Sequence, residues 1–194
     1  MPPSAVKTVR DLMYWQYAKI IAGSSIHDKK SFGYIMDKFK KLQQEEIFWN
    51  EIREYIKEKE KPNECILCGK KTSSLTLDHL FPQSLNGPND EKNVIWVCPQ
   101  CNSSKGAKRL YELWTMKHGL KGAKYDVPRI AEGKYLKFLY EIFEQNNLLN
   151  ISKDDLRQKI CPQCDLQRLC IHEKSEYKLS PLCLDGIATI ILNK

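Results

Sequence analysis

Two cysteine pairs with the same spacing constrain this chain more than any other feature. Cys65 and Cys68 form one C-x2-C pair, and Cys98 and Cys101 form the second. Each pair can place two thiolates on a tight turn, and one tetrahedral zinc ion can join two such turns. A site with four cysteine ligands has no open coordination position, so this zinc is predicted to be structural. The two turns must then lie side by side in the fold.

Regular elements are predicted between and after the cysteine pairs. They are an alternating strand at 74–80, an apolar β-branched strand at 94–97 and a helix at 102–114. Asn102 is the predicted N-cap of that helix. Asp78 and His79 lie in the first strand. The order strand, loop, strand, helix therefore predicts a divalent-ion site between the first strand and the start of the helix.

This stretch resembles the ββα-metal finger of HNH endonucleases, in the variant whose last motif position is asparagine. The resemblance is carried by Asp78-His79, Pro82, Asn93 before the second strand, and the CxxCNxxKG ending at 98–106. A zinc ribbon that contains these residues by coincidence is the alternative. The ordered combination favours the nuclease finger over that alternative.

The resemblance implies a role for each polar residue of the motif. Asp78 and Asn102 would hold Mg²⁺, because one carboxylate and one amide oxygen leave coordination positions for water and phosphate. His79 would deprotonate the attacking water as general base. Asn93 would orient His79 from the loop.

Basic residues after the motif predict contacts with a nucleic acid. Lys105 lies one helical turn past Asn102 and is the candidate phosphate clamp, and Lys108 and Arg109 follow on the same predicted helix. The net charge of +7 favours a polyanionic partner, predicted to be double-stranded DNA. Ordinary solvated helix surface explains part of this charge. The N-terminal basic residues are assigned either to a helical scaffold or to a DNA-contacting surface: Arg10, Lys19, Lys38, Lys40 and Lys41.

A second cysteine set occupies the C-terminal segment. Its members are Cys161, Cys164, Cys170 and Cys183. The C-x2-C-x5-C part resembles the [4Fe–4S] loop of DNA glycosylases of the endonuclease III kind, although the fourth cysteine lies upstream in those enzymes and downstream here. A [4Fe–4S] cluster is favoured, and a second structural zinc, with His172 as a substitute ligand, is the alternative.

The predicted fold class is α+β and mainly helical. Amphipathic helices are expected at 6–21, at 31–61 with a break near 42–46, and at 129–149. Three regions follow: a helical scaffold or DNA-contacting region at 1–62, the nuclease finger at 63–118, and a helical, four-cysteine region at 119–194.

The predicted function is Mg²⁺-dependent, site-specific cleavage of DNA of the restriction or phage type, with homing, packaging and repair as competing roles. A non-catalytic zinc or iron–sulfur module that binds nucleic acid or senses redox state is the alternative. No segment has the roughly twenty apolar residues of a membrane span, and the N-terminus lacks the apolar core of a signal peptide. Cysteines that bind metals must stay reduced, and the cytoplasm is a reducing compartment. The cysteine patterns therefore indicate a cytoplasmic protein of a bacterial, archaeal or phage-infected cell. A homodimer is left open.

Overall fold

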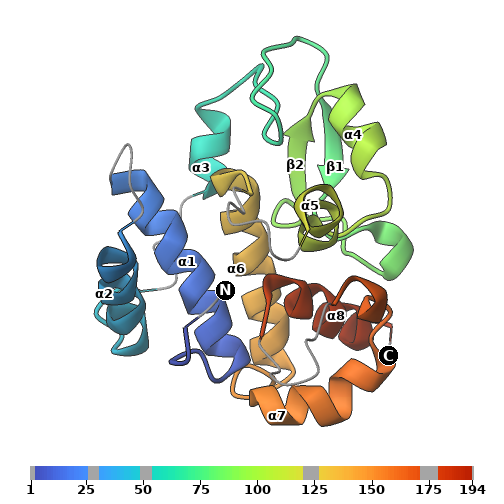
Figure 1. Cartoon of the computed structure of the whole chain (residues 1–194). Coiled ribbons are helices and arrows are strands. Elements are labelled where there is room, and N and C mark those ends of the chain that lie inside the picture. The colour runs from blue at the N-terminus through green and yellow to red at the C-terminus, as the bar shows by residue number, and fades with distance from the viewer. Residues whose placement is uncertain (1–2, 26–30, 49–53, 120–126, 171–178, 194) are drawn as a thin grey trace.

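The computed structural model describes residues 3–25, 31–48, 54–119, 127–170 and 179–193. Within them the fold is α+β and mainly helical, with one two-stranded antiparallel sheet. The predicted fold class is therefore confirmed. Figure 1 shows the sheet at one end of the molecule and most helices at the other.

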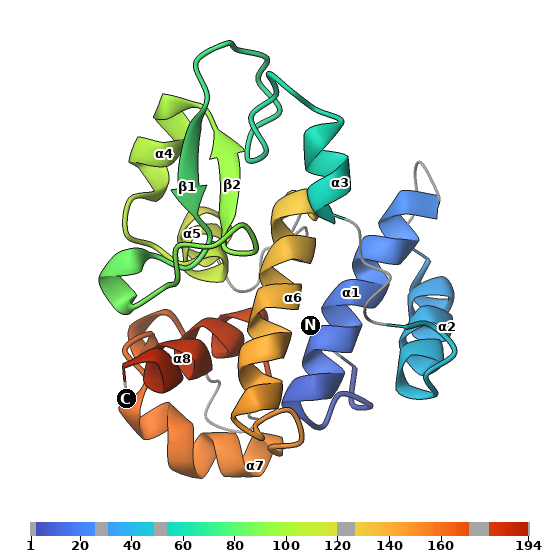
Figure 2. The ribbon, with the colours of Figure 1, turned by 180° about the vertical axis from the view of Figure 1, so that it is seen from behind.

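Helix α6 (Arg129–Gln145) runs through the middle of the helical part and organises its packing. Helix α1 (Val9–Ser25) packs on one side of α6, and α2 (Phe32–Gln43) packs on α1. Helix α8 (Pro181–Leu192) contacts α6 on its other side, as both views show (Figures 1 and 2). The core therefore lies where the apolar faces of α1, α6 and α8 meet.

The N-terminal helices differ from the prediction mainly in their ends. Helix α1 continues through Gly23 to Ser25 instead of ending before this segment. A Cβ at position 23 would lie 2.8 Å from a guanidinium nitrogen of Arg129, so Gly23 serves close packing and not helix termination. The predicted break near 42–46 is confirmed, because α2 ends at Gln43. Helix α3 (Glu54–Lys59) follows.

Strand β1 (Thr76–His79) pairs antiparallel with β2 (Val94–Val97), as the two predicted strands require. The predicted helix at 102–114 is wrong, because two helices occupy this region. Helix α4 (Pro99–Lys105) begins just after Cys98, and Gly106 ends it with a φ of 53°. Helix α5 (Leu110–His118) then starts in a new direction.

Asn102 therefore lies inside α4 and is not its N-cap, a position that Cys98 occupies. The reason is the proline at position 99. Its fixed φ and missing N–H favour the first turn of a helix, so the helix starts three residues earlier than the Asn signal suggested.

A buried ion pair joins the sheet to the helical part. Glu58 of α3 accepts a hydrogen bond from the Trp96 main-chain N–H of β2 at 2.9 Å and one from Lys134 Nζ of α6 at 2.7 Å. Glu58 and Lys134 are both buried. Removing either partner would leave the other charge unpaired in the interior, which costs about 3–5 kcal/mol in comparable pairs. The pair thus fixes the sheet against α6.

The C-terminal segment folds as short turns followed by a buried helix. Short helix α7 (Lys153–Asp155) leads into a π turn at Leu156–Ile160 and 3-10 turns at Cys161–Gln163 and Gln167–Leu169. Helix α8 was not predicted, yet its Leu184 and Ile187 belong to the main core. Among the described residues, no helix has both the length and the apolar character needed to cross a bilayer.

Candidate active site

The first cysteine set forms one compact cluster. The sulfur atoms of Cys65, Cys68, Cys98 and Cys101 all lie within 4.8 Å of one another, and Cys68 Sγ is 3.9 Å from Cys98 Sγ. Four thiolates about 2.3 Å from a tetrahedral zinc lie about 3.8 Å apart, so the spacing fits zinc. The predicted four-cysteine knot is therefore confirmed as a group able to hold such a metal.

The thiols of this knot differ in how readily they ionise. Burial opposes ionisation of Cys65, but hydrogen bonds from the main chain at Cys98 and Cys68 prevail and lower its pKa to about 7. Burial and the neighbouring thiols raise the pKa of Cys101. A bound cation such as a structural zinc would favour the thiolate form of all four cysteines.

The Asp78 carboxylate lies on the buried face of β1. Its Oδ1 accepts a hydrogen bond from Lys105 Nζ at 3.1 Å. Its Oδ2 is buried and has no hydrogen-bond partner among the described residues. Burial raises the pKa of Asp78, even though the Lys105 ammonium acts in the opposite direction. An orphaned, buried carboxylate oxygen is costly by itself and fits a site meant for a cation.

Asn102 of α4 is hydrogen-bonded to strand β1, which carries Asp78. Its Nδ2 donates to Thr76 Oγ1 at 3.1 Å, and Thr76 shares a strand face with Asp78 two residues later. The Asn102 Oδ1 accepts no hydrogen bond from any residue that the structure describes. The Asn102 side chain thus has an oxygen with unused acceptor capacity, and its role as an ion ligand stays a prediction.

The His79 ring is half-buried at the end of β1, and one nitrogen has a partner. Nε2 lies 3.1 Å from Asn89 Oδ1. A carbonyl oxygen can only accept, so this network assigns the ring hydrogen to Nε2 and leaves the lone pair on Nδ1. Within the described chain nothing is bonded to Nδ1. A neutral imidazole with a free, oriented nitrogen can act as a base.

Residues 65–116 match the family model described as HNH endonuclease. This segment, the HNH finger, is therefore similar to that family over about a quarter of the chain. The match spans the knot, both strands, α4 and most of α5, and the site residues Asp78, His79 and Asn102 lie within it. No curated protein and no solved structure matches the chain. The match supports a nuclease function in general terms for the HNH finger.

Asn93 differs from its predicted contact in the HNH finger. Its buried side chain accepts from the Phe81 N–H at 2.8 Å and donates to the carbonyls of Phe81 and Pro88, each at 2.9 Å. Asn93 therefore fixes the loop that follows His79 and does not bond to the ring. The ring partner is Asn89, which sequence reasoning missed because it is one polar residue in the turn-forming stretch GPND.

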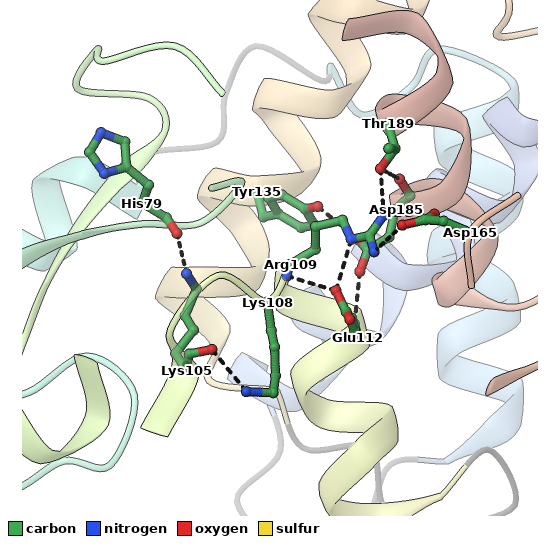
Figure 3. Close-up of polar contacts among 9 residues, drawn as sticks. All are labelled: His79, Lys105, Lys108, Arg109, Glu112, Tyr135, Asp165, Asp185 and Thr189. Atoms are coloured by element: carbon green, nitrogen blue, oxygen red, sulfur yellow. Dashed lines mark hydrogen bonds and ion pairs between the residues drawn. The ribbon is translucent and has the colours of Figure 1, made fainter. Parts of the chain in front are cut away.

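Lys105 also differs from its predicted role. Its side chain is fully buried, and Nζ donates a hydrogen bond to Asp78 Oδ1. Nζ also donates to the main-chain carbonyl of His79 (Figure 3). A buried ammonium that is already bonded does not face a phosphate, so the phosphate-clamp prediction is wrong and Lys105 positions the site. Lys108 is half-buried, with Nζ 3.4 Å from the Lys105 carbonyl.

Arg109 is likewise turned inward, against the expectation of a DNA contact. It is 3% exposed and binds Asp165 with two guanidinium nitrogens, at 3.0 and 2.8 Å (Figure 3). It also donates to Glu112 and to Thr189 of α8. Arg109 therefore joins the HNH finger to the C-terminal segment, a role that required tertiary contacts to recognise.

The second cysteine set also converges, but with a different geometry. Cys161, Cys164, Cys170 and Cys183 line one small cavity. Among the described residues, this second set does not form a group compact enough to hold a single metal ion, whereas the first set does. His172, the suggested substitute ligand, lies outside the described residues.

Proposed function

We propose that this chain is a Mg²⁺-dependent endonuclease that hydrolyses phosphodiester bonds in double-stranded DNA. One observation carries the proposal: among the described residues, the buried Asp78 Oδ2 has no hydrogen-bond partner. The neighbouring His79 Nδ1, which also has no partner in the described part of the chain, supports it. A structural module would be expected to satisfy such a carboxylate with a donor. A metal-dependent nuclease needs a carboxylate oxygen that is free to bind a cation.

The proposed roles follow from the free atoms of the site. Asp78 Oδ2 and Asn102 Oδ1 are the atoms that would hold the ion. A divalent ion there would neutralise the phosphate and stabilise the leaving oxygen. His79 Nδ1 would take a proton from the attacking water, while Asn89 holds the ring hydrogen on Nε2. Lys105 keeps Asp78 partly neutralised and in place through its ion pair.

The proposed substrate and setting rest on charge and cysteine chemistry. The net charge of +7 favours a polyanion such as DNA, and Lys108 is the predicted basic contact that is not fully buried. We place the activity in a reducing compartment, the cytoplasm of a bacterial, archaeal or phage-infected cell, because zinc thiolates require reduced cysteines. Site-specific cleavage of the restriction or phage type is the role that we favour.

The test compares two histidine variants on supercoiled plasmid DNA. With Mg²⁺ present, His79→Ala should lose about two to four orders of magnitude in cleavage rate, the usual contribution of a general base. His118→Ala is the matched control, because His118 is exposed on α5, and it should cleave at the parental rate. Both variants should retain affinity for DNA. Parental cleavage by His79→Ala would refute the mechanism.

A second comparison tests the ion and the specificity. Asp78→Ala should not cleave at any Mg²⁺ concentration that supports the parent chain, since it lacks the proposed ligand. Sequencing the ends produced from a mixed DNA substrate should give one recurring motif. Ends with no common sequence would contradict site-specific cleavage while leaving the nuclease proposal in place.

A further inference from the structure

We infer that Cys161, Cys164, Cys170 and Cys183 bind a [4Fe–4S] cluster, at a site distinct from the zinc knot of the HNH finger. This site is additional to the proposed nuclease function and does not depend on it. The inference rests on how the four side chains converge, how far apart their sulfurs lie, and what surrounds them.

The four cysteines come from separate segments and meet at one place. Cys161 and Cys164 lie at the two ends of a 3-10 turn, Cys170 follows the next turn, and Cys183 lies in the first turn of α8. All four side chains line one small cavity. Convergence of four cysteines from distant positions is difficult to explain by packing alone.

A glycine on α8 makes part of this convergence possible. A Cβ at position 186 would lie 2.5 Å from Cys164 Sγ. Gly186 thus lets the Cys164 sulfur approach the helix that carries Cys183 one turn earlier. The downstream fourth cysteine, which departs from the order in the glycosylase loop, is therefore correctly placed to complete the set.

Sulfur spacing separates a cluster from a single zinc ion. In the zinc knot, Cys68 Sγ and Cys98 Sγ are 3.9 Å apart and all four sulfurs fall within 4.8 Å. Within the described part of the chain, the second set forms no group compact enough to share one ion. A zinc ion holds its four thiolates about 3.8 Å apart, whereas a cuboidal cluster binds one thiolate at each of four irons and spreads them further. The wider set fits the cluster.

The surroundings of the second set also suit an anionic cluster. Leu156, Ile160 and Ile187 complete the cavity wall and provide an apolar shell. Cys183 lies in the first turn of the twelve-residue helix α8, where the helix dipole favours negative charge. The Ser180 N–H donates to Cys183 Sγ at 3.4 Å, a contact that stabilises a coordinated thiolate.

An ion pair between Asp165 and Arg109 helps to connect the cluster site to the HNH finger. Asp165 follows Cys164 directly, and its carboxylate holds the Arg109 guanidinium at the start of α5. Fixing Cys161, Cys164 and Cys170 on one cluster fixes the short loop that presents Asp165. The cluster would therefore stabilise the position of α5 in the HNH finger, in addition to the zinc knot within the finger.

Metal and sulfide content of the full chain provides the test. We expect protein purified without oxygen to contain about four iron atoms, about four acid-labile sulfides and one zinc per chain, with absorbance near 400 nm. Two zinc atoms and no iron would overturn the cluster and assign the site to zinc. One zinc and no iron, after incubation with ferrous iron and sulfide, would overturn the site itself.

A pair of cysteine variants tests the assignment of ligands. Cys170→Ser should lose the iron and the absorbance near 400 nm and keep one zinc, whereas Cys68→Ser should lose zinc and keep iron. Iron content unchanged in Cys170→Ser would refute the proposed ligand set. If either variant is recovered only as aggregate, the composition of the parent chain still decides between the outcomes above.

Discussion

Replacing Lys105 by methionine tests whether this residue positions the active site or contacts DNA. The side chain is fully buried, and its ammonium neutralises Asp78, which is itself 7% exposed. Methionine fills a similar volume without the charge. Removal of one partner of a buried ion pair costs about 3–5 kcal/mol, because the remaining charge is left unpaired. For a chain of this size, that loss should lower Tm by about 6–20 °C.

Thermal unfolding followed by circular dichroism, with zinc-loaded protein in Mg²⁺-free buffer, measures this effect. Lys108→Met is the matched control, since it removes the same charge from a half-buried neighbour whose Nζ has only a 3.4 Å contact with the Lys105 carbonyl. It should shift the free energy of unfolding by no more than about 1 kcal/mol. Mg²⁺ should then raise Tm more for Lys105→Met than for the parent, because Asp78 is freed for the ion.

Equal Tm values for the Lys105 and Lys108 variants would refute the positioning role. A Lys105→Met chain with parental stability but weakened DNA binding would restore the phosphate clamp that the sequence suggested. The two roles therefore give opposite results for the same substitution.

Three further predictions follow from the same geometry. Cys98→Ser should release zinc and unfold the HNH finger, since zinc binding contributes on the order of 10 kcal/mol in small fingers; a folded, zinc-free variant by metal analysis would contradict the knot. Asn89→Ala should lower the cleavage rate about 5- to 10-fold, the value of one lost hydrogen bond to the His79 ring, and an unchanged rate would remove Asn89 from the site. Burial raises the pKa of Asp185 to about 7, so the folded chain retains a proton that the unfolded chain loses above about pH 4. The free energy of unfolding should therefore fall as pH rises towards 7, by up to about 1.4 kcal/mol per pH unit. Urea unfolding of Asp185→Asn between pH 5.5 and 7.5 should lack this slope. Parallel plots of unfolding free energy against pH for the parent and the variant would contradict the pKa shift.

Sequence patterns predicted the parts of the site that depend on spacing. The C-x2-C pairs predicted the four-cysteine knot. Alternation predicted the first strand, with Asp78 and His79 at its end, and an apolar β-branched run predicted the second. These features are local, because a two-residue gap between cysteines or a period of two along a strand has few structural solutions. The family match at residues 65–116 is consistent with that reading.

Side-chain partners could not be predicted in the same way. Lys105, Lys108 and Arg109 look alike in sequence. In the structure the chain turns at Gly106 between α4 and α5, and Lys105 and Arg109 are buried whereas Lys108 is only half-buried. Asn89 and Asn93 are both loop asparagines, and only the loop path decides which one reaches His79. Each outcome depends on contacts between segments that are distant from one another or separated by a turn.

The proposed active site lies between two anchors of different chemistry. On one side the zinc knot fixes the start of α4, which carries Asn102 and Lys105 to strand β1. On the other side Arg109 binds Asp165, and Asp185 of α8 accepts the Glu112 N–H at 2.7 Å, so the start of α5 is tied to the C-terminal segment. The short link between α4 and α5 is therefore held at both ends. A finger of this size has little hydrophobic core of its own, so it needs stabilising contacts at both ends. These contacts hold the Asp78–Lys105 ion pair together. They leave the second Asp78 carboxylate oxygen available to bind an ion.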